Sequence, residues 1–310
     1  MRERWSFSVR CKQWHTLHLL LRQNQKMPAN QSPRTIILAD GSRPEMREAV
    51  ERLRPVIERY LPVVGISMDF GSDLAGIEAE LAIVLGGDGS ILRAAHQMGF
   101  HQLPVLGVNL GRLGFLAGLQ PEQLEHVLPE IAAGRHHLVE HLMVECTTTR
   151  GGKPIYHSLV LNEAAVLAGP PFTMVDIQLY VDGELVTTYS CDGLIVSTPV
   201  GSTAHSLSAG GPILRNDMQA LVILPINPHT LTHRPVVDSA DRTIELAVPE
   251  PLEGTSLVVD GRVLGRIESA DRIKIVRSRA RFRMVEVRGH TYYRTLHDKL
   301  GWSGQIRVNR

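Results

Sequence analysis

The sequence predicts an N-terminal α/β domain with a doubly wound parallel sheet and an all-β C-terminal domain. Short apolar segments alternate with amphipathic helical segments over residues 34–136, which is typical of a parallel sheet covered by helices. Over residues 137–287, short alternating segments are separated by turn dipeptides, which is typical of antiparallel strands. Near the C-terminus lies an amphipathic segment, residues 292–302, that we expect to form a helix.

Composition restricts the partners and the location that we expect. The chain has 310 residues and a formal net charge of +1, so no excess charge favours a nucleic acid as partner. No apolar run approaches the roughly 18 residues that suggest a membrane span, so we expect no membrane partner. The three cysteines, Cys11, Cys146 and Cys191, are far apart, which argues against a disulfide framework or a metal site and favours a reducing, cytoplasmic compartment.

Residues 1–33 differ in composition from the rest of the chain. They are rich in arginine and lysine, and Glu3 is their single acid. Their apolar run is too short for a signal peptide. We expect a disordered extension, or a protein whose true start is Met27; a targeting peptide is the alternative.

Strands and helices alternate through the first domain. Apolar runs predict strands at residues 35–39, 81–85 and 104–108. Apolar residues repeated at helical spacing, with glycine or proline at the ends, predict helices at residues 44–60, 90–98 and 121–133. Pro55 falls inside the first helix and argues against an unbroken one. Because ligands bind at the carboxyl ends of parallel strands, Asp88 and Asn109 fall at the expected binding edge.

A glycine loop follows the most apolar of these strands. Gly86, Gly87, Asp88 and Gly89 lead into a helix for which Ser90 is the expected N-cap. A strand, a glycine loop and a helix N-terminus together form a phosphate site. The carboxylate of Asp88 is unfavourable beside phosphate unless it accepts a proton or binds a cation. The alternative is that Asp88 only caps the helix; the Walker pattern of a P-loop is absent from the sequence.

The second domain is predicted to consist of short strands. They are expected at residues 143–148, 155–161, 174–181, 193–197, 220–224, 243–248, 256–259, 272–277 and 282–287. The dipeptides Asp182-Gly183 and Asp260-Gly261 are strong hairpin signals.

Two stretches of this domain suit a nucleotide. Asn162 and Glu163 place an amide beside a carboxylate, which can bind a base edge and ribose hydroxyls. Residues 192–212 are rich in glycine, serine and threonine and can surround a polar ligand with hydroxyls and backbone groups. Ordinary strand-end polarity and a flexible polar loop are the alternatives.

These stretches carry a resemblance to a known family. Gly86-Gly87-Asp88-Gly89 resembles the signature shared by NAD kinases, diacylglycerol-type lipid kinases and 6-phosphofructokinases. With Asn162-Glu163 and residues 192–212, the chain resembles the ATP-NAD kinase family of bacterial type. Further segments match in family order: residues 109–116, 225–235, 259–261 and 299–302.

The resemblance implies ATP-dependent phosphorylation of the 2′-hydroxyl of the adenosine ribose of NAD, which gives NADP. Mg²⁺, or another divalent cation, would arrive with ATP, because no cluster in the sequence resembles a dedicated metal site. NAD would bind between an α/β domain of residues 34–136 and a β-rich domain of residues 137–287, with residues 288–310 returning to the first. The family also implies a homodimer or homotetramer.

The resemblance also assigns roles to individual residues. Asp88 is the expected base, and Asn162 and Glu163 hold nucleoside groups. The other residues expected to bind NAD are Gly89, Asp192, Thr203, Ala204, His205 and Ser208. The residues expected to bind phosphate are Gly86, Gly87, Gly89 and Ser90.

Three positions depart from the family pattern: Val200 replaces a hydroxyl residue, His205 a tyrosine and Ala168 a basic residue. Two other functions stay open from the sequence. A kinase with the same glycine loop could act on a lipid or a sugar, and a dinucleotide sensor without catalysis could keep residues 192–212 without needing Asp88.

Overall fold

The computed structural model describes residues 32–74, 76–111, 114–170, 174–230, 232–286 and 292–301. The expected N-terminal extension and Cys11 therefore lie outside the described residues. The N-terminal part contains β1 (Thr35–Leu38), α2 (Pro44–Glu58), β2 (Val63–Ser67), β3 (Leu81–Leu85), α3 (Asp88–Met98), β4 (Pro104–Val108), the 3₁₀ turn η1 (Pro121–Gln123) and α4 (Leu124–Ala132).

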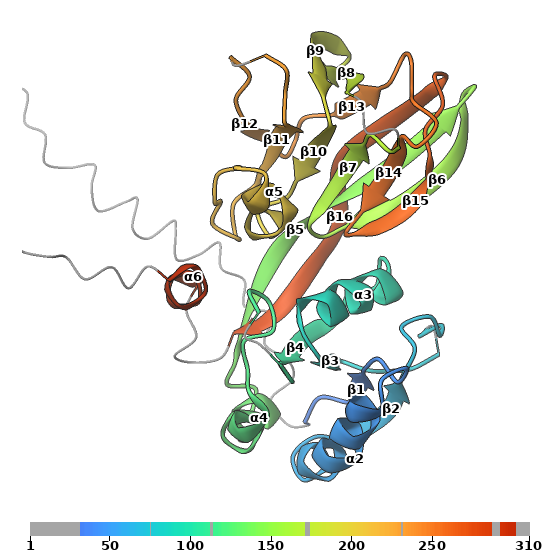
Figure 1. Cartoon of the computed structure of the whole chain (residues 1–310). Helices are drawn as coiled ribbons and strands as arrows, with labels where there is room; N and C mark the ends of the chain where they lie inside the picture. The colour runs from blue at the N-terminus through green and yellow to red at the C-terminus, as the bar shows by residue number, and fades with distance from the viewer. Residues whose placement is uncertain are drawn as a thin grey trace, which may run out of the picture.

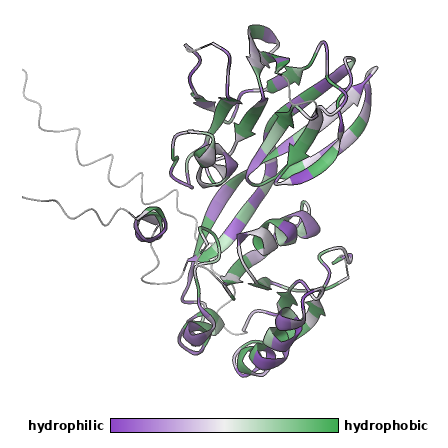
Figure 2. Cartoon of the chain, viewed as in Figure 1, coloured by the Kyte–Doolittle hydropathy of each residue, from purple (hydrophilic) through white to green (hydrophobic). Residues whose placement is uncertain are grey.

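The first four strands form the parallel sheet that the sequence predicts, in the order β2-β1-β3-β4. Helix α3 packs on one face, against residues such as Ile36 and Val84. Helices α2 and α4 pack on the other face, against residues such as Ile37 and Ile83. The arrangement is doubly wound, and β3 is buried along its whole length, which explains its unbroken apolar run. In Figure 2 the strands β3 and β4 are hydrophobic, whereas the helices carry both colours.

The prediction missed β2 and misplaced the start of α3. β2 lies at the edge of the sheet, is only partly buried and contains Gly65, so its apolar signal is weak. α3 begins at Asp88 with Gly87 as its N-cap, two residues before the expected start. Gly87 has the extended backbone of an N-cap, and an acid in the first turn is favourable at the positive end of the helix dipole. Pro55 does not interrupt α2.

The remainder of the chain is mostly β. Its strands are β5 (His137–Arg150), β6 (Lys153–Val160), β7 (Glu163–Leu167), β8 (Val175–Val181), β9 (Glu184–Cys191), β10 (Gly193–Ser197), β11 (Ala220–Ile226), β12 (Val236–Ser239), β13 (Ile244–Ala247), β14 (Ser256–Val259), β15 (Arg262–Arg266) and β16 (Asp271–Glu286). A six-stranded antiparallel sheet has the order β12-β11-β10-β7-β14-β15. One core cluster lies between this sheet and strands β5, β8, β13 and β16.

The long strand β16 joins the two parts of the molecule. It pairs in parallel with β4 at Arg283 and Met284, and antiparallel with β5 and β13. The prediction of two strands here, 272–277 and 282–287, was wrong because an irregularity between Arg277 and Arg281 shifts the register without ending the pairing with β5. Figure 1 shows β5 and β16 running side by side from the α/β part into the β-rich part.

The predicted fold class is confirmed, although one ten-stranded sheet extends through both parts. The domain boundaries stay a prediction. Helix α6 (Tyr292–Leu300), seen end-on in Figure 1, returns to the α/β part, where Lys299 Nζ lies 5.4 Å from the ring centroid of Phe115. It also contacts the β-rich part, since Tyr292 donates a hydrogen bond to the carbonyl of Leu214 at 2.6 Å. Among the helices in the described ranges, none is long and apolar enough to cross a membrane.

Candidate functional site

The glycine loop after β3 leaves an open helix N-terminus. Gly86 has φ +137°, and a Cβ there would lie 2.2 Å from Ser90 Oγ, so only glycine fits. A Cβ at Gly87 or Gly89 would meet no atom within 4 Å, so both face open space. No described side chain caps α3. The N–H of Ser90 donates to the carbonyl of Gly87 at 3.0 Å, so the N–H groups of Asp88 and Gly89, which precede it, are the ones suited to bind an anion. These features are those expected of a phosphate site.

The carboxylate of Asp88 is fixed by the loop that follows β4. Its Oδ2 accepts the backbone N–H of Phe115 at 2.7 Å, and its Oδ1 accepts those of Leu116 and Ala117 at 2.9 and 3.0 Å. These hydrogen bonds go to the loop and not to the helix, so the alternative that Asp88 only caps α3 was wrong. A carboxylate offers about four lone-pair positions, so one stays available to a substrate hydroxyl.

Two buried oxygens at the start of β7 have no partner. Asn162 Oδ1 and Glu163 Oε2 make no hydrogen bond to any described residue. Leaving a buried polar atom unpaired costs about 1–3 kcal/mol, so both atoms are suited to meet a polar ligand. Burial, and then the negative charge of Asp260, raise the pKa of Glu163 to about 8. Glu163 is therefore protonated at neutral pH and can donate a hydrogen bond as well as accept one.

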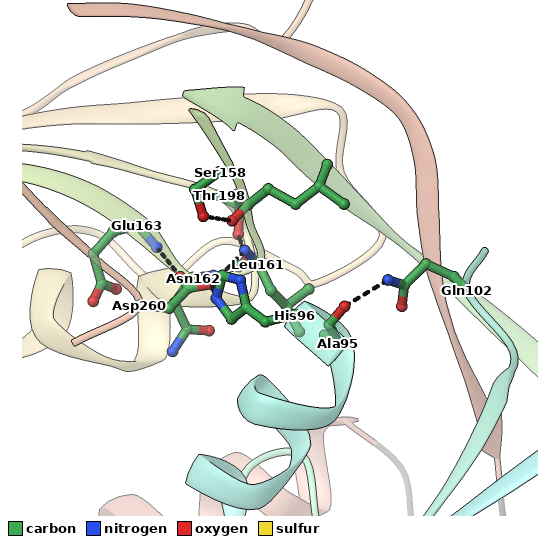
Figure 3. A network of polar contacts seen from close by, with 10 residues as sticks. Ala95, His96, Gln102, Ser158, Leu161, Asn162, Glu163, Thr198 and Asp260 are labelled. Carbon is green, nitrogen blue, oxygen red and sulfur yellow. Dashed lines mark hydrogen bonds and ion pairs between the residues drawn. The ribbon is translucent and has the colours of Figure 1, made fainter. Parts of the chain in front are cut away.

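Asp260 binds the backbone at the start of β7. Sequence reasoning placed it in a hairpin turn and in a segment that matches the family, but gave it no role. Its carboxylate accepts the backbone N–H groups of Leu161, Asn162 and Glu163 at 2.9, 2.7 and 3.0 Å. It also lies 2.8 Å from Nε2 of His96, a residue of α3. Figure 3 shows these side chains grouped where α3 meets the β-rich part. The hairpin expected at Asp260-Gly261 is present between β14 and β15, and Asp260 has φ +47°.

The stretch 192–212 folds onto Asn162 and Glu163. It comprises β10, the 3₁₀ turn η2 (Gly201–Thr203) and α5 (His205–Ser208). Ser197 pairs with Glu163 across the sheet, and the N–H of Thr198 donates to the carbonyl of Asn162 at 2.8 Å. A Cβ at Gly201 would lie 2.2 Å from that same carbonyl oxygen, so glycine permits the close approach. The two nucleotide-suited stretches therefore form one cluster.

Part of the hydroxyl density in this stretch is structural. The Thr198 hydroxyl donates to the carbonyl of Leu161, and that of Ser202 to the carbonyl of Pro199 at 2.6 Å. Ser202 Oγ also accepts the N–H of Leu214 at 3.0 Å. Both side chains are fully buried. We interpreted the serines and threonines as a group that surrounds a ligand. For Thr198 and Ser202 this was wrong, because their hydroxyls bind backbone groups of the protein.

The remaining predicted residues lie in two places. Thr203 and Ala204 are partly buried at the end of η2, and His205 and Ser208 are exposed on α5. Asp192 precedes β10, so that whole strand separates it from Ser197, and its Oδ2 accepts Nδ2 of Asn227 at 2.9 Å. The structure does not bring Asp192 to the Asn162–Glu163 cluster.

The chain is similar to known proteins over most of its length. Residues 67–136 match the model of the ATP-NAD kinase N-terminal domain, and residues 161–287 match that of the ATP-NAD kinase C-terminal domain. The NAD kinase of Rhodopirellula baltica is 52% identical over 278 residues, covering 90% of this chain and 89% of the relative. That of Geotalea daltonii is 38% identical over 251 residues, covering 81% and 88%.

The chain belongs to the ATP-NAD kinase family. Two solved structures of NAD(H) kinases are similar in fold. Yeast NADH kinase complexed with NADH has a TM-score of 0.80 at 23% identity, covering 92% of this chain and 95% of that chain. An NAD kinase from Archaeoglobus fulgidus in complex with ATP has a TM-score of 0.67 at 28% identity, covering 87% and 100%.

The three departures from the ATP-NAD kinase pattern have different settings. Val200 is buried in the core cluster that joins α3 to the β-rich part, so its methyl groups pack where a hydroxyl is common. Ala168 packs against the core between the two sheets. His205 alone is exposed.

Proposed function

We propose that Asp88 is the base of an NAD kinase reaction in which the adenosine 2′-hydroxyl of NAD is the acceptor. ATP-dependent phosphorylation of NAD to NADP is the activity of the family to which this chain belongs, and the chain has that activity. The observation that supports Asp88 is its position: a fixed carboxylate at the open N-terminus of α3, with one lone pair unused.

The proposed step moves one phosphoryl group and one proton. A bond forms between the 2′-oxygen and the γ-phosphorus, the bond to the β–γ bridging oxygen breaks, and ADP leaves with that electron pair. The hydroxyl proton passes to Asp88. Because the transition state is loose, this transfer comes late and asks little of a carboxylate.

The donor phosphates are proposed to bind at Gly86, Gly87, Gly89 and Ser90. The N–H groups of Gly87 and Gly89 are the proposed donors, because those of Gly86 and Ser90 already donate to the carbonyls of Val108 and Gly87, at 2.9 and 3.0 Å. The open space around Gly87 and Gly89 and the uncapped start of α3 support this. Over the ranges that the structure describes, no group of three or more His, Cys, Asp or Glu side chains could hold a metal ion. We assign the divalent cation, Mg²⁺ by preference, to ATP, whose charge it neutralises.

The acceptor is proposed to bind at the start of β7. Asn162 Oδ1 and Glu163 Oε2 are the buried, unpartnered atoms that nucleoside groups can satisfy. With its pKa near 8, Glu163 donates to one ribose oxygen instead of accepting from two hydroxyls, as a carboxylate would. Asp88, Gly89, Asp192, Thr203, Ala204, His205 and Ser208 complete the proposed NAD site. A homodimer or homotetramer and a cytoplasmic location are also proposed, the location being supported by the free, buried thiols of Cys146 and Cys191.

The direct test is turnover of the purified chain with ATP and Mg²⁺, with NAD, a diacylglycerol or fructose 6-phosphate as acceptor. We expect NADP and ADP to form in equal amounts and neither of the other acceptors to react. Phosphorylation of the lipid or the sugar in place of NAD would overturn the proposal. Binding of NAD without turnover would favour a dinucleotide sensor.

A further inference from the structure

One buried carboxylate connects the helix of Asp88 to the backbone of Asn162 and Glu163. The side chain of Asp260 is completely buried, and four donors from two parts of the molecule surround it. Three donors are the backbone N–H groups at the start of β7. The fourth is Nε2 of His96, whose side chain is 13% exposed. Since Asp260 comes from the β14–β15 turn, three segments far apart in the sequence meet at one charge (Figure 3).

The position of His96 determines that of Asp88, because the two residues lie on the same helix. Both residues belong to α3, and a helix rises about 1.5 Å per residue, so they lie roughly 12 Å apart on one rigid element. The apolar contact between α3 and the β-rich part involves Ile91, Ala95, Leu161 and Val200. Apolar burial is not directional, so it constrains how far α3 lies along its partner less sharply than a hydrogen bond does. A charge-assisted hydrogen bond of 2.8 Å does fix that position.

We propose that His96 and Asp260 are positioning residues of the phosphoryl transfer: their pair holds α3, and with it Asp88, at a set distance from Asn162 and Glu163. The inference rests on the proposed function, since it assumes Asp88 as base and Asn162 and Glu163 as nucleoside ligands. Asp260 also favours the protonated form of Glu163, because a second negative charge beside it is unfavourable. The pair therefore positions the proposed base, Asp88, and also favours the protonated form of the proposed ribose ligand, Glu163.

The two residues differ in what their loss removes. Without Asp260, three buried backbone N–H groups lose their acceptor, which threatens the fold. Without His96, Asp260 keeps those three donors, and only the connection to α3 is lost. His96 is therefore the residue to change.

The test compares His96→Leu with His96→Gln, whose Nε2 can take the place of the imidazole donor. The matched control is Gln97→Ala on the same helix. Gln97 Nε2 donates to Ser67 Oγ at 3.0 Å and to the carbonyl of Ser72 at 2.9 Å, both inside the α/β part. Steady-state kcat and the KM for NAD are measured for each variant, with thermal unfolding and circular dichroism to verify folding.

We expect His96→Leu to lower kcat about 10- to 100-fold with the KM for NAD changed less than about threefold, since small displacements of a reacting group are costly. His96→Gln should recover most of kcat, and Gln97→Ala should keep kcat near that of the wild type. Folded His96→Leu with wild-type kcat, or equal losses in His96→Leu and His96→Gln, would overturn the inference. If His96→Leu does not fold, His96→Asn takes its place, because the shorter amide does not reach Asp260. We then expect kcat to fall in His96→Asn and to be mostly retained in His96→Gln, and equal kcat values in the two variants would overturn the inference. A wild-type chain that makes no NADP would instead refute the proposed function.

Discussion

Gly114 lies directly against the carboxylate of Asp88: a Cβ at residue 114 would stand 1.9 Å from Asp88 Oδ1. No rotation of the new methyl group relieves such a contact, so any side chain at this position must displace Asp88 or the loop that binds it. Gly114 therefore helps to orient the proposed base, because the absence of a side chain leaves room for the carboxylate of Asp88.

We expect Gly114→Ala to lower kcat at least 100-fold while the chain still folds and binds NAD, because the displaced carboxylate no longer meets the 2′-hydroxyl. Gly111→Ala in the same loop is the control, since its Cβ would lie 4.0 Å from Asn109 Oδ1, in ordinary contact. Turnover and NAD binding by calorimetry provide the measurement. Equal losses in both variants would point to general damage to the loop.

Replacement of the proposed base itself should separate binding from chemistry. Asp88→Asn is expected to lower kcat by two or more orders of magnitude with NAD affinity retained. It should also lower the free energy of unfolding by about 1–3 kcal/mol, because an amide NH₂ cannot accept a backbone N–H such as that of Phe115. Single-turnover rates and denaturant unfolding measure the two effects. Near-wild-type turnover would remove Asp88 from the base role.

Stability should depend on pH through Glu163. Its pKa is raised from 4.5 to about 8 in the folded chain, so between these values the folded state holds a proton that the unfolded state has released. The free energy of unfolding must then fall as pH rises through this range, by roughly 2–5 kcal/mol from this group. Glu163→Gln should remove that contribution and be more stable than wild type at pH 9. Denaturant unfolding at pH 5, 7 and 9 measures the free energy of unfolding of both proteins. If this free energy changes with pH equally in wild type and Glu163→Gln, the prediction is refuted.

Glu163 also bears on substrate binding. Glu163→Gln keeps a donor and an acceptor at the buried position, so NAD affinity near pH 7 should fall less than for Glu163→Ala. For Glu163→Ala we expect a loss of about tenfold or more, measured by calorimetry. Unchanged affinity in both variants would mean that the ribose does not lie here.

His205 tests whether α5 faces the dinucleotide. It is exposed in the structure, on the helix after the buried hydroxyls of Thr198 and Ser202. We expect His205→Ala to weaken NAD binding about fivefold and His205→Tyr to preserve it, because both rings offer an aromatic face and a polar edge. His101→Ala, at another exposed histidine, is the control. An affinity unchanged by His205→Ala would place this side chain outside the site.

Local features of this protein were predictable from the sequence, whereas long-range ones were not. Short runs of consecutive residues predict the apolar strand β3, the glycines after it and the hairpin at Asp260-Gly261. The role of Asp260 depends on His96, 164 residues away, and no spacing rule connects them. The hydroxyls of Thr198 and Ser202 were misjudged because composition does not distinguish a donor turned toward a ligand from one turned into the loop.

Strand β16 has a consequence for how the molecule unfolds. Because it hydrogen-bonds to β4 at one end and to β13 at the other, neither part can lose its sheet without exposing an edge of the other. The two parts therefore form one cooperative unit, and heat or denaturant should melt the chain in a single transition. For the same reason, any opening of the two parts around NAD would have to bend β16 together with β5, because both strands run from one part into the other.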